Sequence, residues 1–423
     1  MKFSIFTPSH NLKRIDRTIE SVKNQSFKDF EWIICLNNEA ASTENQEKLI
    51  SKLKDAQINH KIIIWNGPTD KIGALKKECC ANASGEFLVE LDHDDELSPD
   101  CLEEINIADI NNQADFYYSD DIDIEEKTGE SIAPYPEANG WQYYTCPRTG
   151  QIASKAFDPS PLSFGYIWFA PNHVRVWKKS FYDQIGGHNE TMDVLDDHEL
   201  LLRTYIQGNC VHISKPLYIY WRHDENTCYG EKNEKIQYLT QELHDKYIQD
   251  LCVKWSDLNN LKKVDLCCHM SPAPNFTGVD SYPYPNVDVV YDLDKPYWPF
   301  EDESVGVFRM QDALEHLKDP IQTMKELQRC LAPHGWVLID VPNTDGRGAF
   351  QDPTHVTFWN SNSFWYYTKS AQSAFINTPV KFQLNRISNY YPSDWHKTHL
   401  IEYTKAHLVK LQDNIIPPGG REI

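Results

Sequence analysis

The chain lacks the features that mark membrane-spanning and nucleic-acid-binding proteins. No hydrophobic run among its 423 residues reaches the length of a transmembrane helix. Lys and Arg number 41 against 62 Asp and Glu, and the net charge of −21 argues against binding to a phosphate backbone. The sequence therefore predicts a protein with neither a transmembrane segment nor a nucleic-acid partner.

Cysteine patterns typical of structural zinc sites are also missing. The 11 cysteines include adjacent pairs at 79–80 and 267–268, but no two have the CxxC spacing. The first residues lead directly into an apolar strand pattern rather than a signal peptide. Reduced thiols and a cytoplasmic location are therefore expected.

What the chain does contain is an alternation of strand and helix patterns in two parts. Its length suits two domains, which we place at residues 1–254 and 255–423. Strands are predicted at 3–8, 31–36, 61–65 and 87–91 of the first domain, and at 263–266, 275–280, 287–293, 305–308 and 335–343 of the second. Helical spacing is found at 72–85, from 196 onward, at 231–255 and at 320–331. This alternation predicts two α/β folds with mostly parallel sheets.

A cluster of carboxylates, Asp92, Asp94 and Asp95, follows the strand at 87–91. Open α/β sheets bind ligands at the carboxyl ends of their strands, and oxygen ligands of this kind suit Mg²⁺ or Mn²⁺ carrying a diphosphate. The alternative is a solvated acidic turn. The loops after the other strands should share this edge, and they contribute Thr7, Pro8, Asn37 and Asn38.

A series of motifs along roughly the first 230 residues resembles inverting glycosyltransferases of family 2, which have the GT-A fold. The matching segments are FSIFTPSHN (3–11), TIESVKNQSF (18–27), FEWII (30–34), GEFL (85–88), LDHDD (91–95), YSDD (118–121), IGGH (185–188), DDHEL (196–200) and YIYWRH (218–223). The resemblance implies a GT-A domain with a Rossmann-like mixed sheet that uses a nucleotide-diphosphate sugar.

The resemblance also implies catalytic and metal-binding residues. The general base maps onto Asp197, with Asp196 as its neighbour, although Asp196 could instead cap the following helix. Asp94 is the expected direct metal ligand, and Asp92 contacts ribose or a metal-bound water. His223 stands where the family places a late His that reaches the metal or the diphosphate, with a structural His as the alternative.

Nucleotide contacts are implied for Lys71, Gly73 and the pair Lys76–Lys77, of which Lys77 is our expected contact; a solvated helix face is the alternative. The family usually carries Asp-Asp-Gly-Ser after its second strand, whereas this chain reads LNNE (36–39). Asn37 and Asn38 offer both donors and acceptors to a base edge, so UDP is favoured while GDP and dTDP stay open.

The polar stretch at 123–162 is long for a connection, and such segments are often lids or binding loops. In the family this region leads to the acceptor side. Trp141 and Trp168 are therefore candidates for stacking on an acceptor sugar, with ordinary packing as the alternative.

The second domain resembles class I S-adenosylmethionine-dependent methyltransferases through ALEHL (313–317), LAPHG (331–335) and DPTHVTFW (352–359). The family's first strand ends in a Gly-x-Gly loop, because backbone must approach the cofactor closely. Here the loop reads LCCHMS (266–271), with Cys267 and His269 replacing the glycines, while Asp280 remains suited to ribose hydroxyls. The resemblance thus implies a degenerate Rossmann-like domain that does not use S-adenosylmethionine in the usual way.

These observations together predict a metal-dependent, inverting hexosyltransferase that moves a sugar from a UDP-sugar to a glycan or other hydroxyl acceptor. Mn²⁺ or Mg²⁺ is the expected cofactor. One alternative is a bifunctional enzyme that also methylates, and another is a non-catalytic glycan-binding or assembly protein. A nucleotidylyltransferase is disfavoured, because no glycine-rich loop with Arg or Lys follows the first strand. The donor sugar, acceptor and oligomeric state stay open.

Overall fold

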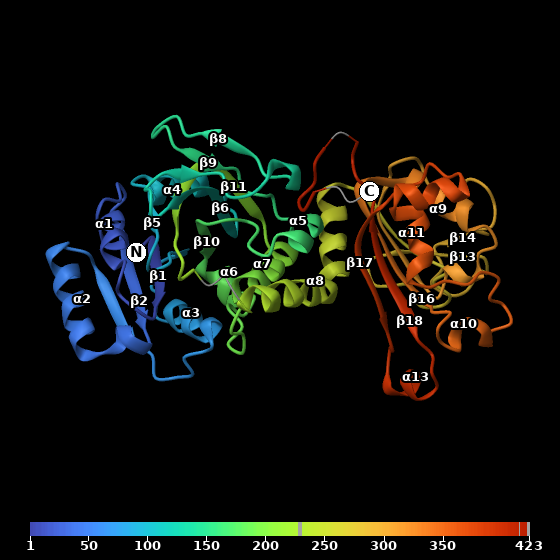
Figure 1. The fold of residues 1–423 in the computed structure, drawn as a ribbon, viewed down its shortest axis with the longest axis horizontal. Coiled ribbons are helices and arrows are strands. Elements are labelled where there is room, and N and C mark those ends of the chain that lie inside the picture. The colour runs from blue at the N-terminus through green and yellow to red at the C-terminus, as the bar shows by residue number, and fades with distance from the viewer. Residues whose placement is uncertain (227–230, 414, 421–423) are drawn as a thin grey trace. The chain divides into compact units, whose positions relative to one another are not determined.

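The computed structural model describes residues 1–226, 231–413 and 415–420. The chain divides into two compact units, Met1–His244 and Asp245–Ile423 (Figure 1). The division lies within α8 (Glu231–Leu258), where the sequence predicts a long connecting helix. No helix in the described part of the chain combines the length and the apolar character that a membrane crossing requires.

The first unit alternates strands and helices over most of its length. Its strands are β1 (Phe3–Ser9), β2 (Phe30–Leu36), β3 (His60–Ile64), β4 (Phe87–Glu90), β5 (Glu96–Leu97), β6 (Phe116–Glu125), β7 (Ser131–Ile132), β8 (Tyr143–Thr145), β9 (Ile152–Ser154), β10 (Arg175–Lys178) and β11 (Cys210–Arg222). Its helices before α8 are α1 (Ile15–Lys23), η1 (Asn38–Ala41), α2 (Thr43–Asp55), α3 (Ile72–Ala81), α4 (Cys101–Asn112), η2 (Glu137–Asn139), α5 (Pro161–Tyr166), α6 (Lys179–Gln184) and α7 (Asp196–Gln207).

The main sheet has the order β3-β2-β1-β4-β10-β6-β11-β5. Strands β3, β2, β1 and β4 are parallel, and β11 is parallel to β6, whereas β10 and β5 run antiparallel to their neighbours. The predicted α/β class with a mixed sheet is therefore confirmed. Since Ser9 pairs with Leu36 at the ends of β1 and β2, the loops after these strands meet at one edge.

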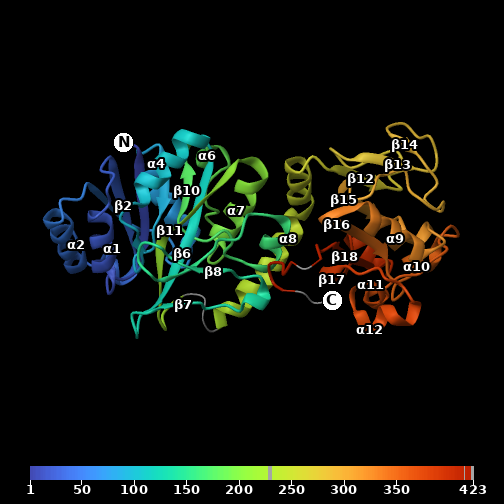
Figure 2. The same ribbon diagram turned by 90° about the horizontal axis from the view of Figure 1, so that it is seen from above.

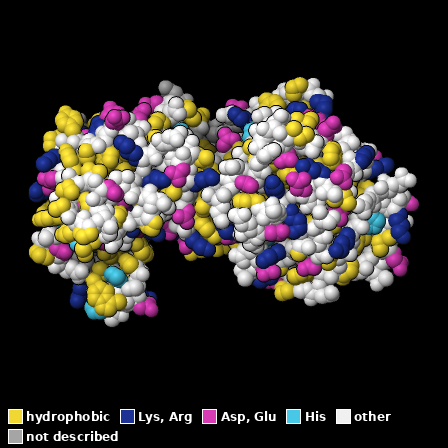
Figure 3. Space-filling model, turned by 180° about the vertical axis from the view of Figure 1, so that it is seen from behind, with side chains coloured by type: hydrophobic (Ala, Val, Ile, Leu, Met, Phe, Trp, Pro, Cys, Tyr) yellow, Lys and Arg dark blue, Asp and Glu magenta, His cyan; other side chains and the backbone are white. Residues whose placement is uncertain are grey.

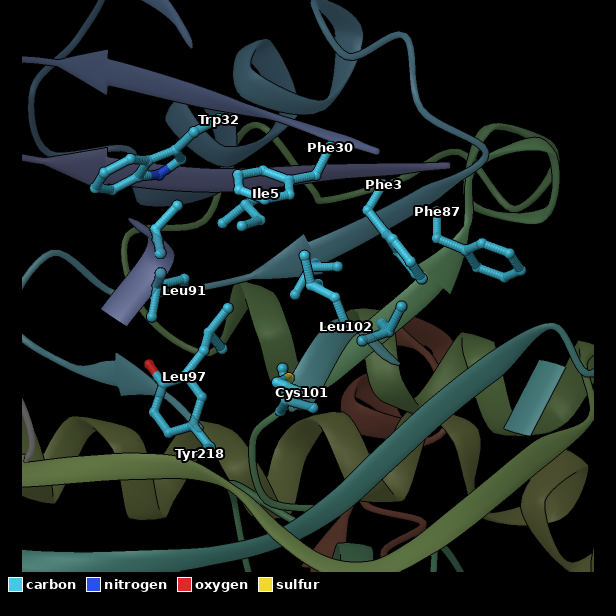
Figure 4. Close-up of a cluster of buried hydrophobic side chains, with 14 of the residues drawn as sticks. Phe3, Ile5, Phe30, Trp32, Phe87, Leu91, Leu97, Cys101, Leu102 and Tyr218 are labelled. Atoms are coloured by element: carbon cyan, nitrogen blue, oxygen red, sulfur yellow. The ribbon is translucent and has the colours of Figure 1, made fainter. Parts of the chain in front are cut away.

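The core beneath that edge is built from the strands' own apolar side chains and from helices α1, α2 and α4. Figure 4 shows part of it, where Leu91, Leu97 and Tyr218 lie together next to the end of β4. Each of these is at most 2% exposed, and burying such a side chain contributes about 1.5–3 kcal/mol to folding. The edge that carries Asp92–Asp95 thus rests on a closely packed base.

Two segments differ from the sequence prediction. Residues 96–97, where the sequence analysis predicts no strand, form strand β5 against β11. The long polar stretch at 123–162 contains the short strands β7, β8 and β9; β7 and β9 pair with β6, and β8 pairs with β9. Strands of two or three residues are too short to show a period in sequence, so only their partners reveal them.

The second unit has a single sheet of seven strands. They are β12 (Lys262–Leu266), β13 (Thr277–Asp280), β14 (Val289–Val290), β15 (Val305–Gln311), β16 (Leu331–Pro342), β17 (Gln383–Tyr390) and β18 (Tyr403–Val409). The helices after α8 are η3 (Leu314–His316), α9 (Pro320–Cys330), α10 (Gly348–Gln351), η4 (Ser361–Phe364), α11 (Trp365–Thr368), α12 (Ser370–Ser373), η5 (Ala374–Ile376) and α13 (Asp394–Thr398).

This sheet has the order β14-β13-β12-β15-β16-β18-β17, with every pair parallel except those of β18. Helix α9 packs beside β16 (Figure 2). The strand order reverses between β12 and β15, and ligands of open α/β sheets bind at such a switch point. Acidic and basic side chains are interspersed over the face of the molecule that Figure 3 shows.

Candidate active site

A cavity of about 820 Å³ opens at the carboxyl edge of the first sheet. It lies where the loops after β1, β2 and β4 meet segments before α7 and after β11. The predicted site residues on its wall are Pro8, Asn37, Asn38, Asp92, Asp94, Trp168, Asp196 and Asp197. Segments far apart in the chain thus supply one cavity of a size that suits a small-molecule ligand.

Two of the predicted cation ligands, Asp92 and Asp94, line the cavity, whereas the third, His223, is buried and is not on the wall. The Nε2 atom of His223, just after β11, lies 2.8 Å from Oδ2 of Asp94. Burial alone would raise the pKa of Asp94, but the hydrogen bond with His223 and the neighbouring His93 lower it overall. Burial raises the pKa of Asp92. Asp94 is therefore the carboxylate best prepared to carry negative charge toward a cation.

Asp95 has a structural task in the same turn. Its carboxylate accepts hydrogen bonds from the Tyr218 hydroxyl at 2.9 Å and from the Trp221 backbone N–H at 2.7 Å. The Tyr218 oxygen in turn accepts from the N–H of Asp92 at 3.1 Å. These bonds tie the turn to β11, so that the turn holds Asp92 and Asp94 on the cavity wall.

The same cavity is also lined by the predicted base, Asp197. Asp197 lies in the first turn of α7, and its Oδ2 accepts a hydrogen bond from Nη1 of Arg175 at 2.7 Å. Burial opposes ionisation, but the charges of Arg175 and Lys76 outweigh it and lower the pKa of Asp197 to about 2. The side chain of Asp197 keeps 15% of its surface exposed, so an ionised oxygen borders the cavity.

Asp196 has a different environment. It is only 3% exposed, and its Oδ2 lies 3.5 Å from Nζ of Lys76. Burial raises its pKa to about 7, although Lys76 acts in the opposite direction. The alternative that Asp196 caps the helix is wrong, because Leu195 occupies the N-cap position. Two adjacent carboxyl groups thus have pKa values pushed far apart, a pattern typical of acid–base sites.

A buried charge network that the sequence analysis did not identify supports this pair. Glu90, at the end of β4, is fully buried, and its carboxylate lies 2.7 Å from Nζ of Lys76 and 3.7 Å from Nη1 of Arg175. His173 Nε2 is 3.5 Å away. The sequence did contain a signal for this network. Glu90 stands in an otherwise apolar strand, and a glutamate is almost never fully buried unless it is paired.

The predicted lysine contact lies at a different position. Lys76 lines the cavity, whereas Lys77 is outside the wall and lies 3.5 Å from Glu190. Lys71 is partly exposed, with its Nζ 3.5 Å from Asp70. The structure therefore brings Lys76, rather than the expected Lys77, to the carboxylates.

Two further predicted contacts have packing roles off the wall. The hydroxyl oxygen of Thr7 accepts a hydrogen bond from the indole N–H of Trp32 at 2.8 Å. A Cβ on Gly73 would lie 2.1 Å from the carbonyl oxygen of Asn189, so only glycine lets α3 approach that segment. Asn37 differs from both, because it is on the wall and its Oδ1 is buried without a hydrogen-bond donor.

The two predicted tryptophans are placed differently. Trp168 lines the cavity, whereas Trp141 is 4% exposed and packs in an aromatic cluster. Its ring stacks on Tyr135 with centroids 4.3 Å apart and lies 5.6 Å from Phe169. Since Tyr135 and Phe169 are both on the wall, Trp141 supports the aromatic surface rather than forming it.

In the second unit, the loop after β12 keeps the backbone that glycines would favour. Cys267 and His269 have φ values of 55° and 50°, which cost non-glycine residues about 1–3 kcal/mol. The carboxylate of Asp280 accepts hydrogen bonds from the N–H groups of His269 at 3.0 Å and Tyr282 at 3.0 Å. Both carboxylate oxygens of Asp280, the residue predicted to bind ribose, therefore already accept hydrogen bonds from the protein's own backbone.

Comparisons with known proteins match the two parts of the chain to two different families. Residues 4–144 match the model of "Glycosyl transferase family 2", and residues 264–394 match that of a "Methyltransferase domain". The chain therefore joins a family 2 glycosyltransferase domain to a methyltransferase-like domain, and both resemblances seen in the sequence are confirmed.

The relatives include a chondroitin synthase of Pasteurella multocida (strain Pm70), 25% identical over 231 residues, which cover 53% of this chain and 21% of that protein. A chondroitin synthase of Escherichia coli is 26% identical over 230 residues, covering 53% and 29%. The match spans less than a third of either relative. Among solved structures, S. aureus TarS 1–349 in complex with UDP has a TM-score of 0.45 at 16% identity and covers 62% of this chain and 71% of that one.

Proposed function

We propose that the first unit transfers a hexose from a nucleotide-diphosphate sugar to a glycan hydroxyl, with inversion and with a divalent cation. The observation that carries this proposal is that one cavity is lined both by Asp94, which is hydrogen-bonded to His223, and by the Asp197–Arg175 pair. An inverting transfer needs these two elements, a site for the diphosphate and a base on the acceptor side.

The donor set fits Mn²⁺ or Mg²⁺. Asp94 and Asp92 offer carboxylate oxygens, His223 offers a ring nitrogen, and such ions complete their coordination with substrate phosphates. When bound, the cation would neutralise charge on the departing diphosphate. Lys76 also lines the cavity and adds a fixed positive charge.

Asp197 would accept the proton of the acceptor hydroxyl as the new bond to the anomeric carbon forms and the nucleotide diphosphate leaves on the opposite face. Its low pKa keeps it ionised throughout the neutral range. The hydrogen bond from Arg175 orients one oxygen, and the N–H of His198 donates to the other at 2.8 Å. The carboxylate is thus held before the acceptor arrives.

UDP is the favoured nucleotide. The unpaired Oδ1 of Asn37 can accept a hydrogen bond from the ring N–H of uracil. The names of the curated relatives, chondroitin and hyaluronan synthases, also support a glycan acceptor. A screen of nucleotide sugars by thermal shift, with and without Mn²⁺, tests this choice, because a ligand that binds the native state raises its melting temperature. Release of UDP in a transfer assay would separate an enzyme from a non-catalytic glycan-binding protein.

Metal dependence gives a direct prediction. UDP should bind at least about tenfold more tightly with Mn²⁺ than in chelator, a difference of about 1.4 kcal/mol, and Asp94→Ala should abolish that difference. Calorimetric titration with UDP measures both. Asp55→Ala, at an exposed position of α2, should behave as wild type. Equal UDP affinity with and without Mn²⁺ in the wild type would contradict the assignment.

We also propose that the second unit does not bind S-adenosylmethionine in the usual way. Both Asp280 oxygens accept backbone hydrogen bonds, and Cys267 and His269 carry side chains where the family has glycines. Titration of the full chain should therefore give no heat with S-adenosylmethionine or its demethylated product, while circular dichroism and a melting curve check that the sample is folded. Micromolar binding of either compound would favour the bifunctional alternative instead.

A further inference from the structure

Three side chains with metal-ligating atoms meet at the carboxyl edge of the second sheet. Glu315 and His316 lie in η3, after β15, and His355 lies in the segment between α10 and η4. One ligand atom from each lies within 4.8 Å of the others. The cluster therefore sits after a strand that borders the point where the strand order reverses, the usual place for a ligand in such a sheet.

Both histidines are oriented as metal ligands usually are. Nδ1 of His355 lies 2.9 Å from the carbonyl oxygen of Ala349, and Nδ1 of His316 lies 3.2 Å from that of Thr354. A carbonyl oxygen can only accept, so these bonds place the ring proton on Nδ1. Each Nε2 is left with a free lone pair, the arrangement that backbone carbonyls impose on metal-bound histidines.

The carboxylate of Glu315 has no partner to explain its burial. The residue is 2% exposed, and both of its carboxylate oxygens are buried without a hydrogen-bond donor. Nε2 of His355 is 3.9 Å from Oε1, which is too long for a hydrogen bond. Burying a carboxylate without a hydrogen-bond donor costs free energy. The unpaired carboxylate of Glu315 therefore indicates that a ligand is missing from this position.

The geometry of the two loops is also fixed. The N–H groups of Val356 and Thr357 donate to the carbonyl oxygen of Glu315 at 2.8 and 3.0 Å. These bonds join the two segments next to the ligating side chains. The cluster is therefore held together by the backbone before any ion is present, while half-buried His316 leaves it reachable from solvent.

We propose that Glu315, His316 and His355 bind one divalent transition-metal ion. Two imidazoles and one carboxylate are a ligand set that Zn²⁺ and Fe²⁺ share, and three protein ligands leave coordination positions for an oxygen donor of a bound molecule. The site is separate from the proposed cation site of the first unit, whose ligands are Asp92, Asp94 and His223.

The test uses the full chain carrying Asp94→Ala, so that the first unit's cation site is disabled. After treatment with chelator, Zn²⁺ is titrated by calorimetry, and Co²⁺ is followed by its visible absorption. We expect one equivalent of Zn²⁺ with a dissociation constant below about 10 μM and a Co²⁺ spectrum of mixed nitrogen and oxygen ligands. Glu315→Gln and His316→Gln should each weaken binding at least about tenfold, as loss of a ligand does.

His399→Ala is the matched control, because His399 is exposed and lies in the same unit; it should leave binding unchanged. Circular dichroism and melting curves check that each variant is folded, and half-buried His316 provides the milder substitution if Glu315→Gln does not fold. Absence of Zn²⁺ binding, binding that survives His316→Gln, or equal loss in His399→Ala would each overturn the proposal.

Discussion

Replacing Asp197 by Asn should lower sugar transfer by about 10²- to 10⁴-fold, the usual contribution of a general base. Asn has nearly the same shape and can still accept the hydrogen bond from Arg175, but it cannot take a proton at neutral pH. Binding of UDP with Mn²⁺ should survive, since Asp197 is not one of the proposed cation ligands. Initial rates with saturating donor, together with UDP titration of the same sample, measure the two effects separately.

Asp196→Asn is the matched control for this prediction. Asp196 is 3% exposed and its pKa is raised to about 7 by burial. That pKa is nearer to neutral than the pKa of Asp197, which is the property expected of an efficient base, but the side chain of Asp196 is only 4% exposed, whereas that of Asp197 is 15% exposed. We therefore expect Asp196→Asn to lower the rate of sugar transfer less than Asp197→Asn does. An active Asp197→Asn variant with an inactive Asp196→Asn variant would assign the proton transfer to Asp196.

Replacing Lys76 by Met should destabilise the first unit by about 3–5 kcal/mol, because it removes the cation from a buried network and leaves charges unpaired. Glu90 would lose its 2.7 Å partner and Asp196 its 3.5 Å neighbour. The melting transition of the first unit, identified in the wild type as the one that UDP with Mn²⁺ raises, should fall by on the order of 10 °C.

The adjacent residue gives the control. Lys77→Met removes the same charge from the same helix, but Lys77 is 38% exposed in its side chain and pairs with Glu190 at 3.5 Å. Exposed pairs of this kind contribute about 0–1 kcal/mol, so the melting temperature should change little. Similar destabilisation by both substitutions would show that the network around Glu90 is not the cause.

The positions of these two lysines also show how far sequence analysis reached. The apolar spacing of Ile72, Leu75 and Cys79 correctly predicted helix α3. Successive helical residues point about 100° apart, so Lys76 falls next to the apolar face of that helix, whereas Lys77 points away from it. The phase of the helix was thus available in the sequence, whereas the partners of Lys76 come from β4 and α7, which only the folded chain brings near.

In the second unit, too, some features were visible in the sequence and others appear only in the folded structure. Departure of residues 266–271 from the glycine pattern was visible in the sequence, but the occupation of Asp280 by two backbone N–H groups was not. Likewise, Glu315-His316 and His355 matched two separate family motifs, and His355 comes 39 residues after His316. Their convergence depends on the way β15 and β16 end at the same edge of the sheet.

The sequence by itself determined the α/β class, the strand after which Asp92 and Asp94 stand, and the helix that begins at Asp196, because apolar periodicity and the position of a motif at a strand end are local properties. The tertiary structure decided which of those groups share a cavity and which short strands form. It also decided that Glu90 and Arg175 form charge pairs beside Asp196 and Asp197. These features depend on hydrogen bonds and charge pairs between segments far apart in the chain, whose energies exist only once the sheet has assembled.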